Sequence, residues 1–171
     1  LKKDEKINLY VGAPCPIRER FDRELLAKYV ENGTPIFGIC RGHQTLAVHF
    51  GGTLIQDMWH ETNPRDNRRK KVHSVRLNTE YLSSIGINLT TKRNKPISII
   101  DVNSIHHQVV DQIPMLAIPI ANYMKTVDSF SDDEVNEALF YPELNIASVQ
   151  WHPEEVHDEL SILLIKKLLK L

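Results

Sequence analysis

The sequence has few of the residues that mark specialised classes of protein. Of its 171 residues only two are cysteine, Cys15 and Cys40, so the chain does not rest on a disulfide framework. We therefore expect a reducing, cytoplasmic setting, in which a special cysteine has a chemical role and not a structural one. Seven glycines and nine prolines are too few for a fibrous or low-complexity chain.

An excess of one charge and long hydrophobic runs are also absent. Lys and Arg number 21 against 22 Asp and Glu, which leaves a net charge of -1. Such a chain has no overall electrostatic footprint for nucleic acid or for an anionic membrane. No apolar run approaches the roughly 20 residues of a membrane-spanning helix. We expect no nucleic-acid partner and no membrane partner, and the length predicts one globular domain.

The spacing of apolar residues predicts helices alternating with strands. Helical spacing is found over 17–32 and again over 41–50. Between them, the unbroken apolar run at 35–39 suits a strand that is buried on both faces. Strands are also predicted over 72–77, 97–102 and 145–150, and an amphipathic helix over 156–171. This alternation predicts an α/β fold built on a parallel sheet.

The segment Gly38-Ile39-Cys40-Arg41-Gly42 places a cysteine where a strand is expected to meet a helix. A nucleophile on such a tight turn needs small neighbours, and Gly38 and Gly42 meet that need. The N-terminal end of a helix favours the thiolate form of Cys40, and the N–H of Arg41 is well placed to bind an oxyanion. The alternative is a buried structural cysteine, because this motif alone is weak evidence.

A histidine and a glutamate stand two residues apart near the end of the chain, in the segment 149–154. Pro153 excludes a continuing helix, and residues two apart in an extended segment point to the same side. His152 and Glu154 can therefore act together: Glu154 accepts a hydrogen bond from one ring nitrogen, and the other nitrogen faces a thiol. The alternative is a surface histidine beside the solvated acidic pair Glu154 and Glu155.

Together, GICRGHQ (38–44) and VQWHPE (149–154) resemble the class I glutamine amidotransferase superfamily. Segments between them, among them GGTLIQD (51–57) and VNSIHHQVV (102–110), look like the gamma-glutamyl-gamma-aminobutyrate hydrolase group. The resemblance covers nearly the whole chain in the right order. It implies a three-layer α/β sandwich of the flavodoxin-like class I glutamine amidotransferase fold, with a mostly parallel central sheet.

The same resemblance implies the domain organisation. Residues 1–171 are expected to form a single glutamine amidotransferase-like hydrolase domain. In relatives the first strands and a glycine-rich loop, which gives a second oxyanion N–H, precede the nucleophile. Only KINLYVGAP (6–14) resembles the end of that region here. We therefore expect the natural protein to be longer, with its N-terminal strands upstream of the printed sequence.

The resemblance also implies a catalytic triad. Cys40 is the expected nucleophile, His152 the general acid and base, and Glu154 the residue that orients His152. Gln44 matches a glutamine that helps to hold the glutamyl moiety in relatives. Four residues match a segment that lines the family's substrate pocket: Asn103, Ser104, His106 and His107.

The adjacent histidines His106 and His107 could suggest a metal site. Neighbouring side chains in a strand point to opposite faces, however, and no Cys, His and Asp cluster has the spacing of metal ligands. We therefore expect no metal and no cofactor. Four other histidines are interpreted as solvated or core-edge side chains: His43, His49, His60 and His157.

The function implied by the resemblance is hydrolysis of a gamma-glutamyl amide bond through a gamma-glutamyl thioester. The substrate would be a small molecule, and the products glutamate and an amine. Two alternatives stay open: a glutaminase component that passes ammonia to a partner synthetase, and a non-catalytic descendant that keeps the fold. The sequence does not determine which amine is released. It also leaves the oligomeric state open, and a homo-oligomer is one possibility.

Overall fold

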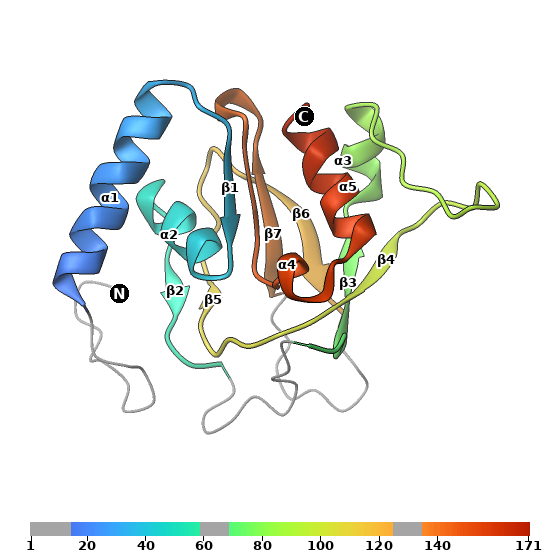
Figure 1. The fold of residues 1–171 in the computed structure, drawn as a ribbon, viewed down its shortest axis with the longest axis horizontal. Coiled ribbons are helices and arrows are strands. Elements are labelled where there is room, and N and C mark those ends of the chain that lie inside the picture. Colours follow the sequence, from blue (N-terminus) through green and yellow to red (C-terminus); the bar gives the residue numbers. More distant parts are fainter. Residues whose placement is uncertain (1–14, 59–68, 125–134) are drawn as a thin grey trace.

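The computed structural model describes residues 15–58, 69–124 and 135–171, which form an eight-stranded sheet with helices packed against it (Figure 1). The helices are α1 (Pro16–Glu31), α2 (Arg41–His49), α3 (Thr79–Ser84), α4 (Pro153–Val156) and α5 (Glu159–Leu168), with a short 3-10 helix at Pro142–Leu144. The strands are β1 (Ile36–Ile39), β2 (Leu54–Ile55), β3 (His73–Leu77), β4 (Ile99–Val102), β5 (Val109–Val110), β6 (Ile118–Tyr123), β7 (Asn136–Tyr141) and β8 (Ile146–Val149).

The sheet is mixed. Its neighbours run in the order β1, β8, β7, β6, β3 and β4, and β5 pairs with both β2 and β7. Among the described strands only β1 and β8 pair in parallel, and the other pairings are antiparallel. The α/β class is thus confirmed, but the described part of the sheet is not mostly parallel. One reason is connection length: only residues 142–145 join β7 to β8, and so short a link permits antiparallel pairing alone.

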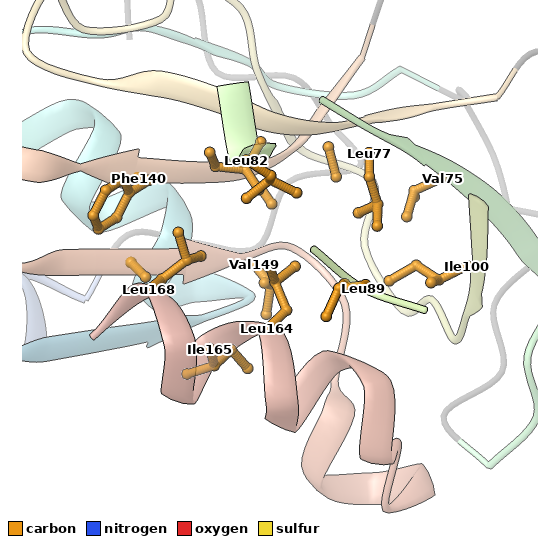
Figure 2. Close-up of a cluster of buried hydrophobic side chains, with 14 of the residues drawn as sticks. Val75, Leu77, Leu82, Leu89, Ile100, Phe140, Val149, Leu164, Ile165 and Leu168 are labelled. Atoms are coloured by element: carbon orange, nitrogen blue, oxygen red, sulfur yellow. The ribbon is translucent and has the colours of Figure 1, made fainter. Parts of the chain in front are cut away.

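Different helices cover the two faces of the sheet. Successive residues of a strand point to opposite faces, and β7 shows the consequence. Phe140 joins the buried cluster that contains Leu164 of α5 (Figure 2). Its neighbour Leu139 joins the cluster that contains Leu26 of α1 and Leu46 of α2. The sheet is therefore the middle layer of three, as expected.

Helix α1 begins and ends close to the predicted positions, but it buries a different face. Pro16 occupies its first turn, and Gly33 follows it with a φ of +63°, a conformation that glycine adopts freely. Of the four residues whose spacing predicts the helix, Phe21, Leu25 and Tyr29 are exposed, and only Val30 packs partly buried against the core. Leu26 is the buried residue that docks α1 onto the sheet.

The amphipathic helix expected over 156–171 is divided into two. The single turn α4 ends at His157, which has a φ of +48° and so breaks the helix. A new helix, α5, starts after Asp158, whose carboxylate accepts a hydrogen bond from the N–H of Ser161 at 3.2 Å. Within the described ranges, no helix is both long and apolar enough to cross a bilayer.

Candidate active site

Cys40 lies on the turn between β1 and α2, as the motif predicts. Its backbone has a φ of +48° and a ψ of −101°, a conformation that costs a non-glycine residue about 1–3 kcal/mol. The Cys40 N–H donates to the carbonyl oxygen of Val149 at 2.8 Å, and the Cys40 carbonyl accepts from the N–H of Gln44 at 3.2 Å. The strand on one side and the helix on the other therefore hold the residue in this conformation.

The two glycines that flank Cys40 are not equivalent. A Cβ on Gly38 would lie 2.6 Å from Cδ1 of Leu46 and 2.8 Å from the carbonyl carbon of Gly42. A Cβ on Gly42 would meet no atom within 4 Å. The close approach of β1 to α2 thus requires glycine at position 38 alone, and the steric need predicted for Gly42 is not found.

The parallel pairing of β1 with β8 brings the second half of the site to Cys40. Ile39 of β1 is in register with Val149 of β8, so the residues that follow both strands emerge at the same edge of the sheet. The first of these on β8 is Gln150, which is fully buried. Its amide nitrogen lies 3.6 Å from the Cys40 sulfur. His152 follows two residues later, at the start of α4.

His152 and Glu154 form the hydrogen bond predicted for them. Nδ1 of His152 lies 2.8 Å from Oε1 of Glu154. A carboxylate can only accept, so Nδ1 carries the proton and Nε2 of the neutral ring is left with its lone pair. Nε2 is buried and has no hydrogen-bond partner among the described residues. The backbone differs from the extended segment expected, because Glu154 lies in the helical turn α4.

Two amide side chains connect this pair to the rest of the sheet edge. Asn103, which follows β4 and is fully buried, accepts a hydrogen bond from the N–H of His152 at 3.0 Å. Gln44 of α2 donates from its amide nitrogen to the carbonyl of Gln108 at 2.9 Å and to Oε1 of Gln150 at 3.1 Å. Gln44 thus holds the amide that faces the thiol. Its contact with a glutamyl moiety stays a prediction.

His106 and His107 point to different carboxylates, as expected for adjacent residues. Nε2 of His106 lies 3.7 Å from Oε1 of Glu137, and Nδ1 of His107 lies 3.5 Å from Oδ1 of Asp57. Ser104 is buried beside them. Among the described residues no three His, Cys, Asp or Glu side chains are placed to hold a metal ion. The substrate-lining role of Ser104, His106 and His107 stays a prediction.

His43 is not the solvated or core-edge side chain expected. It is fully buried, and its Nδ1 lies 2.9 Å from the hydroxyl oxygen of Ser148 on β8. Burial lowers the pKa of His43 to about 4, although the charge of Glu137 opposes this shift. His43 is therefore neutral at pH 7. His49 and His157 are exposed, and His60 lies outside the described residues.

Arg41 is the first residue of α2, where backbone N–H groups are not used within the helix. The role of its N–H as an oxyanion donor stays a prediction. The guanidinium Nη2 lies 2.9 Å from Oδ2 of Asp22 and so joins α2 to α1. The segment 6–14, which resembles the end of the region bearing the second donor, lies outside the described residues.

Sequence reasoning does not single out two residues of this site, Gln150 and Glu137. Gln150 lies inside the recognised histidine segment 149–154, but only the β1–β8 register shows that it faces Cys40. Glu137 is 1 % exposed. An acidic residue within an apolar strand, VNEALF (135–140), is the signal that could have marked it.

A three-layer α/β fold with a cysteine on this turn and a His–Glu pair at the adjacent strand end is the arrangement that the resemblance to the class I glutamine amidotransferase-like superfamily implies. Solved structures share the fold. A protein named as part of a GMP synthase from Thermoplasma acidophilum has a TM-score of 0.61 at 22 % identity, over 94 % of this chain and 68 % of that one. A glutamine amidotransferase from Thermotoga maritima has a TM-score of 0.51 at 17 % identity, over 94 % and 66 %. At these identities the likeness is one of fold.

The chain belongs to the Peptidase C26 family, whose sequence profile matches residues 4–154. It is 30 % identical over 154 residues to the glutamine amidotransferase-like protein YvdE of Lactococcus lactis subsp. lactis, a match that covers 88 % of this chain and 58 % of the relative. It is 32 % identical over 150 residues to a glutamine amidotransferase of Mycobacterium tuberculosis, over 87 % and 44 %. The chain thus spans about half the length of these curated relatives.

Proposed function

We propose that this chain carries the nucleophile and the acid–base pair of a cysteine hydrolase that cleaves a gamma-glutamyl amide bond. The observation that carries the proposal is the 2.8 Å contact between Nδ1 of His152 and Oε1 of Glu154. It leaves the other ring nitrogen as a base at the sheet edge that also presents Cys40. Membership of Peptidase C26 and relatives named as glutamine amidotransferases support the reaction class.

In the first half of the reaction, Nε2 of His152 takes the thiol proton of Cys40. The thiolate adds to the gamma-carbonyl carbon, a C–S bond forms, and the carbonyl electrons move onto oxygen. The N–H of Arg41 donates to this oxyanion. When the carbonyl re-forms, the C–N bond breaks, and the imidazolium of His152 gives its proton to the departing amine. The product on the enzyme is a gamma-glutamyl thioester.

In the second half, His152 takes a proton from water, and the hydroxide adds to the thioester carbon. Collapse of this intermediate breaks the C–S bond and releases glutamate, and the Cys40 sulfur recovers its proton from His152. Glu154 keeps the ring in one tautomer throughout and stabilises its charged form. The overall reaction consumes one water and needs no redox partner. We propose a small-molecule substrate and neither a nucleic acid nor a membrane as partner.

The test is Cys40→Ala in the full-length protein, assayed on glutamine and on a panel of gamma-glutamyl amines without added partner. We expect a loss of turnover of at least about a thousandfold, since the thioester route is closed, with an unchanged unfolding midpoint. Cys15→Ala is the matched control, because Cys15 is the other cysteine of the chain and is exposed. It should retain full activity. Undiminished turnover by Cys40→Ala would exclude the proposal.

The same panel separates a second candidate, a glutaminase that serves a synthetase. Its support is the 29 % identity over 140 residues to the glutamine-hydrolysing GMP synthase of Citrobacter koseri, of which the match covers 23 %. A glutaminase of that kind should hydrolyse glutamine weakly unless a synthetase is added, and should leave gamma-glutamyl amines intact. A non-catalytic descendant should leave Cys40 unlabelled by a thiol-directed glutamine analogue.

A further inference from the structure

A buried carboxylate lies next to the proposed catalytic residues and takes no part in the proposed reaction. Glu137 of β7 is 1 % exposed. Its Oε1 lies 3.4 Å from Nε2 of His73 on β3 and 3.7 Å from Nε2 of His106. The backbone carbonyl of Glu137 also accepts from the N–H of Gln150 at 2.8 Å. The backbone of Glu137 is therefore hydrogen-bonded to Gln150, the residue whose side chain contacts Cys40.

The pKa of Glu137 lies below its ordinary value in spite of its burial. Burial alone would raise the pKa of its carboxyl group, but a hydrogen bond from His73 and the positive charges of nearby histidines outweigh that effect and lower the pKa. An ionised carboxylate in an apolar interior costs several kcal/mol unless a counter-charge accompanies it. The histidines close enough to supply such a counter-charge are His73 and His106.

The contacts of the two ring nitrogens bear on the charge of His106. Nδ1 of His106 lies 3.2 Å from the carbonyl oxygen of Gln108, and its Nε2 faces Glu137. The Gln108 carbonyl can only accept, so Nδ1 of His106 carries a proton, whereas Nε2 makes no hydrogen bond among the described residues but lies within ion-pair distance of the carboxylate oxygen. A second proton, on Nε2, would make the ring an imidazolium paired with Glu137. His43, another histidine near Glu137, is neutral because burial lowers its pKa to about 4.

The segment that carries His106 is attached to the active site at both ends. Asn103 accepts from the N–H of His152, and the carbonyl of Gln108 accepts from the amide of Gln44. The ring of His106 lies between these two contacts and donates to the same Gln108 carbonyl. A change in the charge of His106 would thus act on the residues that place His152 and Gln44.

We propose that Glu137 is a positioning residue: its carboxylate keeps His106 as an imidazolium, and the ion pair fixes residues 103–108 against His152 and Gln44. The part of this proposal that concerns turnover rests on the proposed function. The part that concerns the charge of His106 does not depend on it. The other groups that face the pair are His73 from β3 and His43 from α2.

The first experiment reads the charge directly. Nitrogen-15 NMR of the full-length protein with labelled histidine should show both ring nitrogens of His106 protonated at neutral pH, with the signals assigned by their loss in His106→Asn. In Glu137→Gln, which keeps the shape and removes the charge, His106 should titrate at lower pH and be neutral at pH 7. A neutral His106 in the unmodified protein would overturn the proposal, and this outcome does not depend on whether Glu137→Gln folds.

The second experiment reads the consequence for turnover. Glu137→Gln should lower kcat by about tenfold to a hundredfold, the cost of misplacing a catalytic group by up to ~1 Å. The alkaline fall of its pH–rate profile should move to lower pH, as His106 loses its proton earlier. Glu137→Asp, which keeps the charge, should recover part of the rate. A merely structural role would not move the pH profile.

The matched control is Glu143→Gln, which removes the same charge from an exposed position just after β7. It should change neither the titration of His106 nor the pH–rate profile. If Glu137→Gln alters the titration but leaves kcat and its pH profile unchanged, the positioning role is wrong. If the unmodified protein cleaves no gamma-glutamyl substrate, the proposed function fails while the titration still tests the ion pair.

Discussion

At the scale of single residues, the contact between Gln150 and Cys40 bears on the reactivity of the thiol. Nε2 of Gln150 lies 3.6 Å from the sulfur, and Gln44 holds the amide from the other side. A donor at this position stabilises the thiolate, the form that attacks carbon. Loss of one such hydrogen bond is worth about 1 kcal/mol, or roughly fivefold in rate.

We therefore expect Gln150→Leu to slow the alkylation of Cys40 by iodoacetamide roughly fivefold at neutral pH, since less of the thiol is ionised. The measurement uses a Cys15→Ala background, in which Cys40 is the one remaining cysteine. Gln112→Leu, at an exposed glutamine, should leave the rate unchanged. Equal rates for Gln150→Leu and its parent would show that the amide does not act on the sulfur.

The residues with recognisable chemistry could be predicted from the sequence, and the residues that support them could not. Cys40 and the His152–Glu154 pair stand in short local motifs, and a motif needs no tertiary contact to be recognised. Gln150 faces Cys40 because two strands 110 positions apart share one register. Glu137 faces His106 across the same sheet. Such contacts depend on strand order, which apolar spacing does not determine.

At the scale of elements, the junction of β1 with α2 depends on the absence of a side chain at Gly38. We expect Gly38→Ala to destabilise the fold by about 1–3 kcal/mol, because the new methyl group would overlap Leu46 and the backbone of Gly42. Gly42→Ala should have the opposite sign, about 0.5–1 kcal/mol more stable, since alanine is the better helix former and its Cβ meets open space.

Urea unfolding of both variants measures these two opposite effects. If the turn were sensitive to any substitution, both variants would be less stable than the parent. A lower midpoint for Gly42→Ala than for Gly38→Ala would contradict the packing seen between β1 and α2. The comparison concerns stability alone, because both positions lie close to Cys40, the proposed nucleophile.

Elements with a strong apolar period were predicted well, and those whose identity depends on neighbours were not. The predicted ranges for α1, α2, β1 and β8 agree with the structure within about two residues. The short elements β2, β5 and α3 have too few residues for a period to show. The sheet is expected to be mostly parallel, but in the described part most paired strands run antiparallel. One reason is the short link that joins β7 to its neighbour β8.

At the scale of the whole molecule, buried His43 makes stability sensitive to acid. Its pKa is about 4 in the folded protein and near 6.5 in an unfolded chain. As the pH falls below the pKa of His43 in the unfolded chain, the unfolded chain binds a proton at this histidine and the folded protein does not. The free energy of unfolding therefore decreases until the pH reaches the pKa of His43 in the folded protein. From about pH 7.5 to about pH 5 this amounts to about 2 kcal/mol. The lowered pKa of Glu137 adds to the loss at still lower pH.

We expect His43→Gln to reduce the loss of unfolding free energy over this interval by about 2 kcal/mol, whatever its effect at neutral pH. Denaturant titrations at the two pH values measure the difference. His49→Gln, at an exposed position on the same helix, should keep the full dependence on pH. An unchanged dependence in His43→Gln would mean that His43 takes up its proton in the folded state near its ordinary pKa.

The backbone at Cys40 has a consequence for the history of such a protein. Its φ of +48° is accessible to glycine without the cost that a side chain incurs. A chain with glycine at position 40 would therefore have a more stable fold than the chain with cysteine. It would also lack the sulfur that the proposed reaction needs. Selection for stability alone would favour glycine at this position, so we expect cysteine there to trade stability for the proposed activity.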